Sequence, residues 1–339
     1  MYCCANCFSD RFLKAHIAQK SILTEICSFC GTNTTPVIEP SSLSDRFQPL
    51  IDLYTVCGDE DGLFLYQYLQ NDWSIFSGLV EVKQRELLAE ICCGRIPLEK
   101  KYLPKIKPVS GRINKWNEFQ EELKHINRYF PNNVPDTKHL EYWFGLLRLQ
   151  DDEKPGEIFR ARINKKGEKF ELNDMGRPAS ETTSNGRANP LGISYLYAAS
   201  DVRTAISEVR PYKGEIVTVA RIQVYKDIEI ADLRNPKHTI SPFELEEGDL
   251  NNLYSEMPYL IILGEELSKP IIPREADLDY LPSQYLCEFV KHIGLKGVLY
   301  KSSLAEGDNI ALFNDDGLNY VEKKEYIVVD NNIHYEELS

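Results

Sequence analysis

One stretch of the chain, residues 185–208, combines side chains whose types and spacing could do chemistry. It opens with Gly186-Arg187, continues into an apolar strand expected at 193–199 that carries two tyrosines, and ends in an expected helix with Glu208. Gly186 and Gly192 would let the backbone approach a ligand closely, and a guanidinium binds anions through paired hydrogen bonds. The stretch can therefore hold an anionic, ring-bearing ligand against a single carboxylate.

The elements around this stretch must bring those side chains together. Ser200 or Asp201 can cap the helix that carries Glu208, because both side chains accept hydrogen bonds from helix N-termini. Strands and helices do not alternate regularly, so we expect a mixed α+β domain instead of a doubly wound parallel sheet. The expected elements are strands at 157–163, 193–199, 215–224 and 297–301, and helices at about 201–209 and 284–293, the last ended by Gly294.

The ordered set of these residues resembles the RES domain, a family of NAD+-consuming enzymes that includes several toxins. The resemblance covers about residues 157–315, and the family usually has an aromatic residue after Gly-Arg, where this chain has Ala188. It implies a fold similar to ADP-ribosyltransferases, and an activity that cleaves NAD+ with phosphate or water or transfers ADP-ribose to a target. The matching pieces are Phe159-Arg160, Gly186-Arg187 with Asn189 and Gly192, Tyr197, Ala205 and Glu208, Gln284 with Glu288, and the segments 297–302 and 309–313.

The residue types support this chemistry independently of the resemblance. The nicotinamide–ribose bond of NAD+ has a cationic leaving group that departs as a neutral amide, so no strong general acid is needed. A carboxylate beside the oxocarbenium-like ribose stabilises the charge as it forms. Glu208 fits this role, although an isolated glutamate on a helix is more often solvated. Arg160 and Arg187 would hold the pyrophosphate through paired hydrogen bonds, the alternative for each being a surface ion pair.

Four further side chains belong to the expected site. Tyr197 could stack on nicotinamide or hydrogen-bond a ribose, and its alternative is core packing with a satisfied hydroxyl. Ser302 could bond Glu208 or the ribose, or be an ordinary loop serine. The resemblance also places Asn189 and Asn309 among the residues that bind the dinucleotide. Glu288 could serve the site, but a role in anchoring its own helix is the stronger interpretation.

Cysteine pairs near the beginning of the chain predict a metal site. Cys4-x2-Cys7 and Cys27-x2-Cys30 are separated by 19 residues, a spacing typical of a zinc ribbon. Four thiolates leave no open position for water, so the Zn2+ would be structural and would supply folding energy to a short segment. Cys3 could replace Cys4 as a ligand, but Cys4 gives the better geometry.

Three sections are predicted: a zinc ribbon at 1–40, a helical region at 41–150, and the RES-like domain at 151–330. The helical section resembles the HEPN-like region that accompanies some RES domains, and the composition shift at 150–156 indicates a boundary. Arg11 and His16 have the spacing of the HEPN ribonuclease motif, but they lie in the zinc ribbon, so we do not expect ribonuclease activity.

Composition excludes several classes of partner. The net charge of the 339 residues is −13; residues 151–339 hold 34 acidic and 22 basic residues, which leaves 18 and 17 in 1–150. Neither part is a basic surface for a polynucleotide, so no nucleic-acid partner is expected. No apolar run of about 18 residues predicts a membrane span, and the first residues lack the features of a signal peptide. We therefore expect a cytoplasmic protein.

The sequence thus predicts an NAD+ phosphorylase or NAD+ glycohydrolase, with phosphate as the favoured acceptor and water next. A bacterial toxin or phage-defence effector is the natural setting, and it implies an antitoxin or regulatory protein as partner. Two alternatives stay open: a protein ADP-ribosyltransferase, and a non-catalytic protein whose zinc ribbon is the binding surface. The trigger, the oligomeric state and the role of the helical section are also open.

Overall fold

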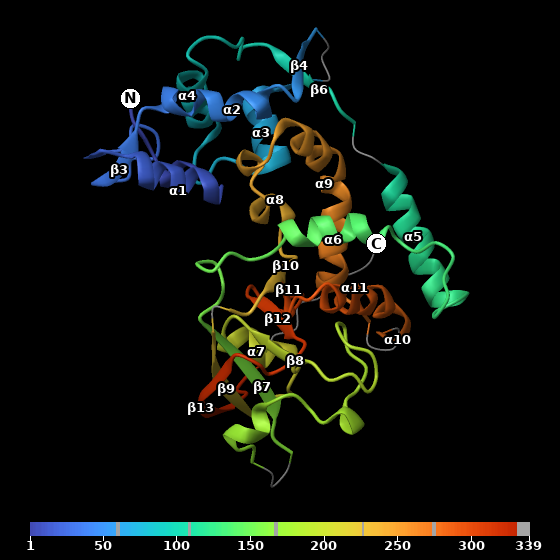
Figure 1. Ribbon diagram of the computed structural model, residues 1–339. Helices are drawn as coiled ribbons and strands as arrows, with labels where there is room; N and C mark the ends of the chain where they lie inside the picture. The colour runs from blue at the N-terminus through green and yellow to red at the C-terminus, as the bar shows by residue number, and fades with distance from the viewer. Residues whose placement is uncertain (59–61, 108–109, 166–168, 226, 273–275, 331–339) are drawn as a thin grey trace, which may run out of the picture. The chain divides into compact units, whose positions relative to one another are not determined.

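A computed structural model describes residues 1–58, 62–107, 110–165, 169–225, 227–272 and 276–330 (Figure 1). The chain divides into two compact units. The first comprises Met1–Ser110 and Pro236–Tyr259, and the second comprises Gly111–Asn235 and Leu260–Ser339. The protein is of the mixed α/β class. Among the described residues, no helix combines the length and the apolar character needed to cross a membrane.

The first unit contains two small antiparallel sheets and several helices. One sheet has the order β1-β3-β2 and the other has the order β4-β6-β5. The strands are β1 (Cys3–Cys4), β2 (Leu23–Glu25), β3 (Thr35–Ile38), β4 (Tyr54–Cys57), β5 (Leu63–Phe64) and β6 (Lys101–Pro104). The helices are α1 (Arg11–Lys20), α2 (Ser44–Ile51), α3 (Leu65–Trp73), α4 (Glu81–Cys92), α8 (Pro236–Thr239) and the first part of α9 (Glu247–Ser268).

The second of these sheets differs from the mostly helical section that the sequence predicts. The apolar spacing over residues 61–69 suggests one helix, whereas α3 begins at Leu65 and Leu63–Phe64 forms β5. Strand β6 pairs with both β4 and β5, which lie far from it in the sequence. Short strands of two to four residues carry too little periodicity to be recognised locally. The resemblance of 41–150 to HEPN-like regions stays a prediction.

The second unit is built on a seven-stranded sheet in the order β10-β11-β12-β8-β7-β9-β13. The β10–β11 pair is parallel and the other pairs are antiparallel. The strands are β7 (Glu157–Ile163), β8 (Leu196–Ala199), β9 (Ile216–Val224), β10 (Ile230–Asp232), β11 (Gly297–Lys301), β12 (Asp308–Leu312) and β13 (Leu318–Ile327). The helices are α5 (Ser110–His125), α6 (Thr137–Leu146), α7 (Val202–Glu208), the end of α9, α10 (Ala276–Asp279) and α11 (Leu281–His292).

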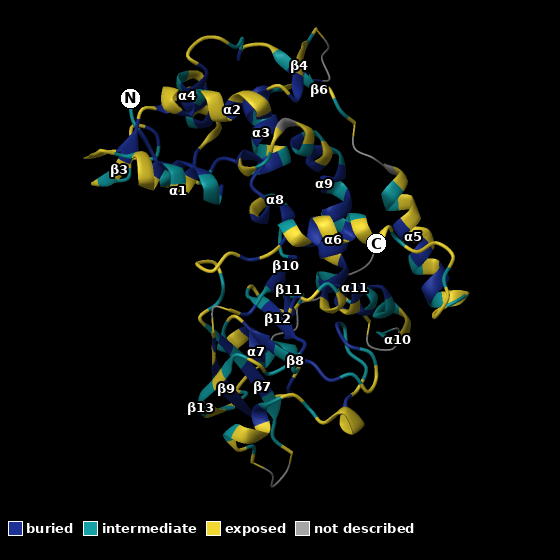
Figure 2. Cartoon of the chain, viewed as in Figure 1, coloured by how far each residue is buried: buried dark blue, intermediate teal, exposed yellow. Residues whose placement is uncertain are grey.

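The inner strands of the sheet are buried on both faces, because apolar side chains point to either side of them, whereas no residue of edge strand β13 is buried. In β9, Val217 and Val219 join one cluster, while Ala220 and Ile222 join another. Helix α7 contributes Ala205 to the first of these clusters. Figure 2 accordingly shows β10, β11 and β12 mostly dark blue. The strands expected at 157–163, 215–224 and 297–301 and the helix ended by Gly294 are all present.

Candidate active site

Helix α7 presents Glu208 from its last position. Asp201 is the N-cap: its Oδ1 accepts a hydrogen bond from the Thr204 backbone nitrogen at 2.8 Å, and its Oδ2 accepts from the Thr204 hydroxyl at 2.7 Å. These bonds fix the start of a seven-residue helix, and buried Ala205 holds it against the sheet. The position of Glu208 is therefore set by the N-cap and by the packing of Ala205.

Two side chains converge on Glu208, Ser302 from the position after β11 and Asn309 from β12. Its Oε1 accepts hydrogen bonds from the Ser302 hydroxyl at 2.6 Å and from Asn309 Nδ2 at 2.7 Å. The Ser302 oxygen itself accepts from the backbone nitrogens of Leu304 and Ala305, at 3.0 and 3.1 Å. Because those bonds occupy its lone pairs, the hydroxyl proton is directed at the carboxylate. Glu208 is thus held in one orientation.

Arg160 lies on β7 and is buried, with 9% of its surface exposed. Its Nη1 donates to the backbone oxygen of Tyr197 at 2.8 Å, and its buried Nε has no partner within the described part of the chain. Burial, together with the charge of nearby Arg162, lowers the pKa of Arg160 to about 10. The guanidinium therefore remains charged at neutral pH and retains unused hydrogen-bonding capacity.

Arg187 is held differently, at the edge of a loop. Its Nη1 donates to the backbone oxygen of Lys269 at 2.8 Å, and its guanidinium carbon lies 5.7 Å from the centre of the Tyr280 ring. The ring face attracts the cation. The other guanidinium nitrogens remain available for an anion.

Asn189 organises the loop that carries Arg187. Its Nδ2 donates to the backbone oxygens of Ser184, Pro190 and Ile193, while its Oδ1 accepts from the Tyr197 hydroxyl at 2.7 Å. The same tyrosine hydroxyl accepts from the Ala188 nitrogen at 2.9 Å. These bonds occupy the polar atoms of both side chains. The ring of Tyr197 is therefore the part that remains available for contact with a ligand.

Gly186 and Gly192 are required for different structural reasons. A Cβ added to Gly186 would lie 2.4 Å from Asn189 Oδ1 and 2.7 Å from the Tyr197 hydroxyl, so only glycine fits there. Gly192 has a φ of +83° and open space around it, as at a turn. The close approach at Gly186 is therefore to side chains of the protein, Asn189 of the loop and Tyr197 of β8, whereas we expected it to be to a ligand.

Helix α11 holds the same loop from another side. Gln284 Nε2 donates to Asn185 Oδ1 at 2.6 Å, to Gly186 O at 2.8 Å and to Asn189 O at 3.1 Å. The neighbouring Ser283 hydroxyl donates to the backbone oxygen of Arg187 at 2.7 Å. Glu288 is exposed on this helix and does not line the cavity described next.

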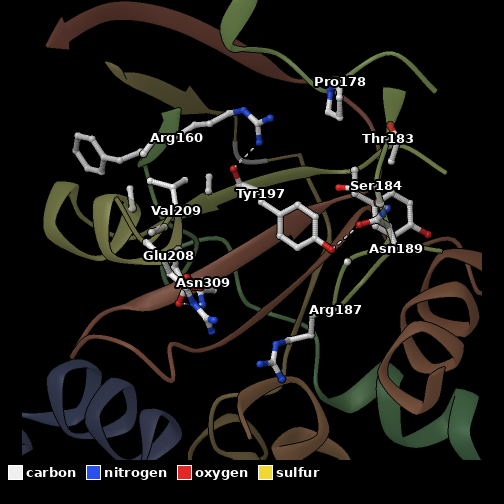
Figure 3. A pocket seen from close by; sticks show the side chains of 18 of the residues that line it. Arg160, Pro178, Thr183, Ser184, Arg187, Asn189, Tyr197, Glu208, Val209 and Asn309 are labelled. Atoms are coloured by element: carbon white, nitrogen blue, oxygen red, sulfur yellow. Dashed lines mark hydrogen bonds between the residues drawn. The ribbon is translucent and has the colours of Figure 1, made fainter. Parts of the chain in front are cut away.

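Arg160, Arg187, Tyr197, Asn189, Glu208 and Asn309 all line one cavity of about 420 Å³. Figure 3 shows the Tyr197 ring between Arg160 on one side and Arg187 on the other, with Glu208 next to Asn309. Ser302 is coupled to this cavity through its bond to Glu208, and its neighbour Ser303 lines the wall. The sequence did not single out Arg210, Tyr280 and Tyr300, which also line it. Tyr300 lies within the motif at 297–302, but no sequence motif contains Arg210 or Tyr280.

The charges around this cavity favour an anion. Three guanidinium groups, from Arg160, Arg187 and Arg210, line it together with a single carboxylate, that of Glu208. The chain as a whole carries a net charge of −13, so this local excess of positive charge runs against the overall balance. A partly enclosed positive cavity with aromatic walls suits a phosphate-bearing ligand with rings.

A separate cluster of four cysteines lies in the first unit. The sulfur atoms of Cys4, Cys7, Cys27 and Cys30 lie within 4.8 Å of one another, an arrangement that could hold a metal ion. Cys4 and Cys30 are 3.4 Å apart and Cys7 and Cys27 are 3.3 Å apart, sulfur to sulfur. Cys3 precedes Cys4 on β1 and is not in this cluster. Successive side chains of a strand point to opposite faces, which explains the difference.

Comparison with known proteins identifies the family of this chain. The RES domain family matches residues 158–331, more than half of the chain, and the chain therefore belongs to that family. No curated protein matches it significantly in sequence. Among solved structures, the crystal structure of the M. tuberculosis MbcT-MbcA toxin-antitoxin complex is similar at 13% identity with a TM-score of 0.35, covering 56% of this chain and 92% of that one. This structural likeness is too weak to carry an argument about function.

Proposed function

We propose that this chain cleaves NAD+ at the bond between nicotinamide and ribose. The observation that carries the proposal is the Glu208 carboxylate, which accepts hydrogen bonds from Ser302 and Asn309 inside the cavity that Arg160 and Arg187 also line. Membership of the RES domain family supports the same conclusion.

The chemistry needs a fixed negative charge beside the ribose. When the C1′–N bond breaks, its electron pair neutralises the pyridinium nitrogen and nicotinamide departs without a proton. The ribose then carries positive charge, which a preorganised carboxylate stabilises more in the transition state than in the ground state. Glu208 supplies that charge, and Ser302 and Asn309 act as positioning residues because they orient it.

The remaining residues divide between binding the substrate and shaping the cavity. Arg187 and Arg160 hold the diphosphate, since both have guanidinium nitrogens left for hydrogen bonds. The ring of Tyr197 packs against the substrate, because its hydroxyl is already occupied by Asn189 and Ala188. Asn189 contributes to substrate binding by positioning the loop that carries Arg187.

The test is nicotinamide release by the purified full chain. Glu208→Gln keeps the size of the side chain and removes its charge, so we expect kcat/KM for NAD+ to fall by about 100-fold or more. Glu288→Gln removes an exposed carboxylate that does not line the cavity, and it should change the rate less than about twofold. Equal rates for the wild type and Glu208→Gln would reject the proposal in favour of a non-catalytic binding protein.

The acceptor of the ADP-ribose separates three reactions. With NAD+ labelled in the ADP-ribose part, soluble ADP-ribose indicates water and ADP-ribose 1-phosphate indicates phosphate. Label that stays on a protein indicates an ADP-ribosyltransferase. Phosphate is the acceptor that we favour.

We also propose that the cysteine cluster binds one structural Zn2+, because four thiolates match its preference for tetrahedral sulfur ligands. Burial raises the pKa of the Cys4 thiol, and a bound cation would favour its thiolate form. We expect one zinc ion per chain by elemental analysis, and none after all four cysteines are replaced by serine.

An NAD+-degrading enzyme acting in the cytoplasm as a toxin or defence effector would need an antitoxin or another regulatory partner.

A further inference from the structure

Arg210 stands immediately beyond helix α7 in an unusual backbone conformation. Its φ is +50°, in the left-handed region where the Cβ of an L-residue crowds the backbone. Val209 is the C-cap of α7, so Arg210 occupies the next position, where helices commonly have glycine. The chain keeps a long cationic side chain at a place where glycine would be free of strain. Strain of this kind concentrates at functional sites.

Arg210 lines the candidate site, and its side chain has no partner among the described residues. It lines the cavity that contains Glu208, and it also lines a neighbouring surface groove. Among the residues that the structure describes, no hydrogen bond, ion pair or ring contact involves its guanidinium. Arg160 and Arg187 differ in this respect, because each donates to a backbone oxygen. Arg210 is exposed, so it is reached from solvent at the mouth of the cavity.

Its place next to Glu208 has a chemical consequence. The carboxylate that stabilises a ribose cation also repels any anionic nucleophile that approaches the same carbon. A free guanidinium two residues away offsets this repulsion and binds a phosphate through two parallel hydrogen bonds. A neutral nucleophile such as water would need no cation there.

We propose that Arg210 holds an inorganic phosphate, which is the acceptor in the cleavage of NAD+. This inference rests on the proposed function and on phosphate as its acceptor, and it adds the residue that binds the phosphate. An oxygen of hydrogen phosphate forms the bond to C1′ of the ribose, and the C1′–N bond breaks with its electron pair going to the nicotinamide nitrogen. The phosphate proton stays on another phosphate oxygen. The products are neutral nicotinamide and ADP-ribose 1-phosphate, so charge and atoms balance.

The experiment measures nicotinamide release by the full chain as NAD+ and inorganic phosphate are varied independently. In the wild type, release should rise with phosphate and saturate. Arg210→Gln should raise the KM for phosphate at least tenfold, and should change the KM for NAD+ much less. The control is Arg203→Gln. Arg203 is an exposed arginine on α7, and it lines the neighbouring groove but not the cavity. This variant should leave the KM for phosphate within about twofold of the wild type.

A second variant separates binding from folding. Arg210→Gly removes both the guanidinium and the strain at φ +50°, so its Tm should rise by about 2–4 °C. It should nevertheless show the same increase in the KM for phosphate as Arg210→Gln. A more stable protein with weaker phosphate use cannot be explained by damage to the fold.

Three results would overturn the inference in distinguishable ways. Nicotinamide release that does not depend on phosphate would reject it and leave NAD+ cleavage intact. A KM for NAD+ that rises in Arg210→Gln while the KM for phosphate does not would assign Arg210 to the dinucleotide instead. No release of nicotinamide by the wild type under any phosphate concentration would reject the proposed function and this inference together.

Discussion

Replacing Ser302 by alanine tests whether the orientation of Glu208 matters for catalysis. The variant removes the 2.6 Å hydrogen bond to Glu208 Oε1 and leaves the 2.7 Å bond from Asn309 in place. The backbone nitrogens of Leu304 and Ala305 lose their acceptor, but both bonds lie near the surface, where water can replace it. The loss should therefore fall mainly on the carboxylate.

The size of the effect follows from the kind of bond. A hydrogen bond to a charged group contributes about 1.5–3 kcal/mol. If that energy is realised only when Glu208 faces the ribose cation, kcat falls by about 10- to 150-fold, at 1.36 kcal/mol for each factor of ten. The KM for NAD+ should stay nearly constant, because Ser302 positions Glu208 and does not bind the ground state.

The assay is steady-state nicotinamide release, with Ser207→Ala as the matched control. The Ser207 hydroxyl donates to the Arg203 backbone oxygen within α7, next to Glu208 in sequence, and its loss should change kcat less than about twofold. Ser302→Ala and Asn309→Ala combined should lose less than the sum of the single effects, because both act through one carboxylate oxygen. A Ser302→Ala enzyme with unchanged kcat would refute the positioning role. A raised KM with normal kcat would instead place Ser302 in contact with NAD+.

Three further predictions concern the scaffold. Gly186→Ala should destabilise the protein by about 1–3 kcal/mol in urea denaturation, because its Cβ would lie 2.4 Å from Asn189 Oδ1; unchanged stability would mean that the loop can shift freely. Asp201→Ala should cost about 1 kcal/mol at pH 7 through loss of the N-cap of α7. Burial raises the pKa of Asp201, but hydrogen bonds from Thr204 outweigh this and lower it. The cap therefore stabilises the fold fully above the ordinary aspartate pKa, and the stability difference between wild type and Asp201→Ala disappears as acid protonates the folded carboxyl. A stability difference that persists at low pH would contradict the mechanism. Removal of metal by a strong chelator should lower the Tm and expose the thiols of Cys4, Cys7, Cys27 and Cys30 to a thiol reagent, whereas thiols that react equally before and after chelation would exclude a bound ion.

Local signals in the sequence predict the elements that carry the site. A run of β-branched residues identifies β9, and the capping residues Ser200 and Asp201 identify the start of α7. The cysteine pairs predict the four-sulfur cluster because two tight turns bring each pair together over a short distance. The sequence leaves Ser200 and Asp201 open as the cap, and the hydrogen bonds to Thr204 identify Asp201.

Features that depend on distant contacts are not predictable in this way. Helix α9 has 22 residues but contains Pro258, which disfavours helix in isolation. The pairing of β6 with β5 joins segments about 40 residues apart, and no local pattern encodes it. Arg210 belongs to no motif, because its importance lies in a left-handed backbone next to a cavity. The internal hydrogen bonds of Asn189 are likewise invisible until the loop is folded.

The three hydrogen bonds from Gln284 have a thermodynamic consequence for whatever enters the cavity. They hold residues 185–189 in one arrangement, and the Ser283 bond to Arg187 adds a fourth restraint. A loop that is already ordered has little conformational entropy left to lose when a ligand arrives. Affinity then reflects the direct interactions with the ligand more fully, and dissociation does not wait for the segment to unfold.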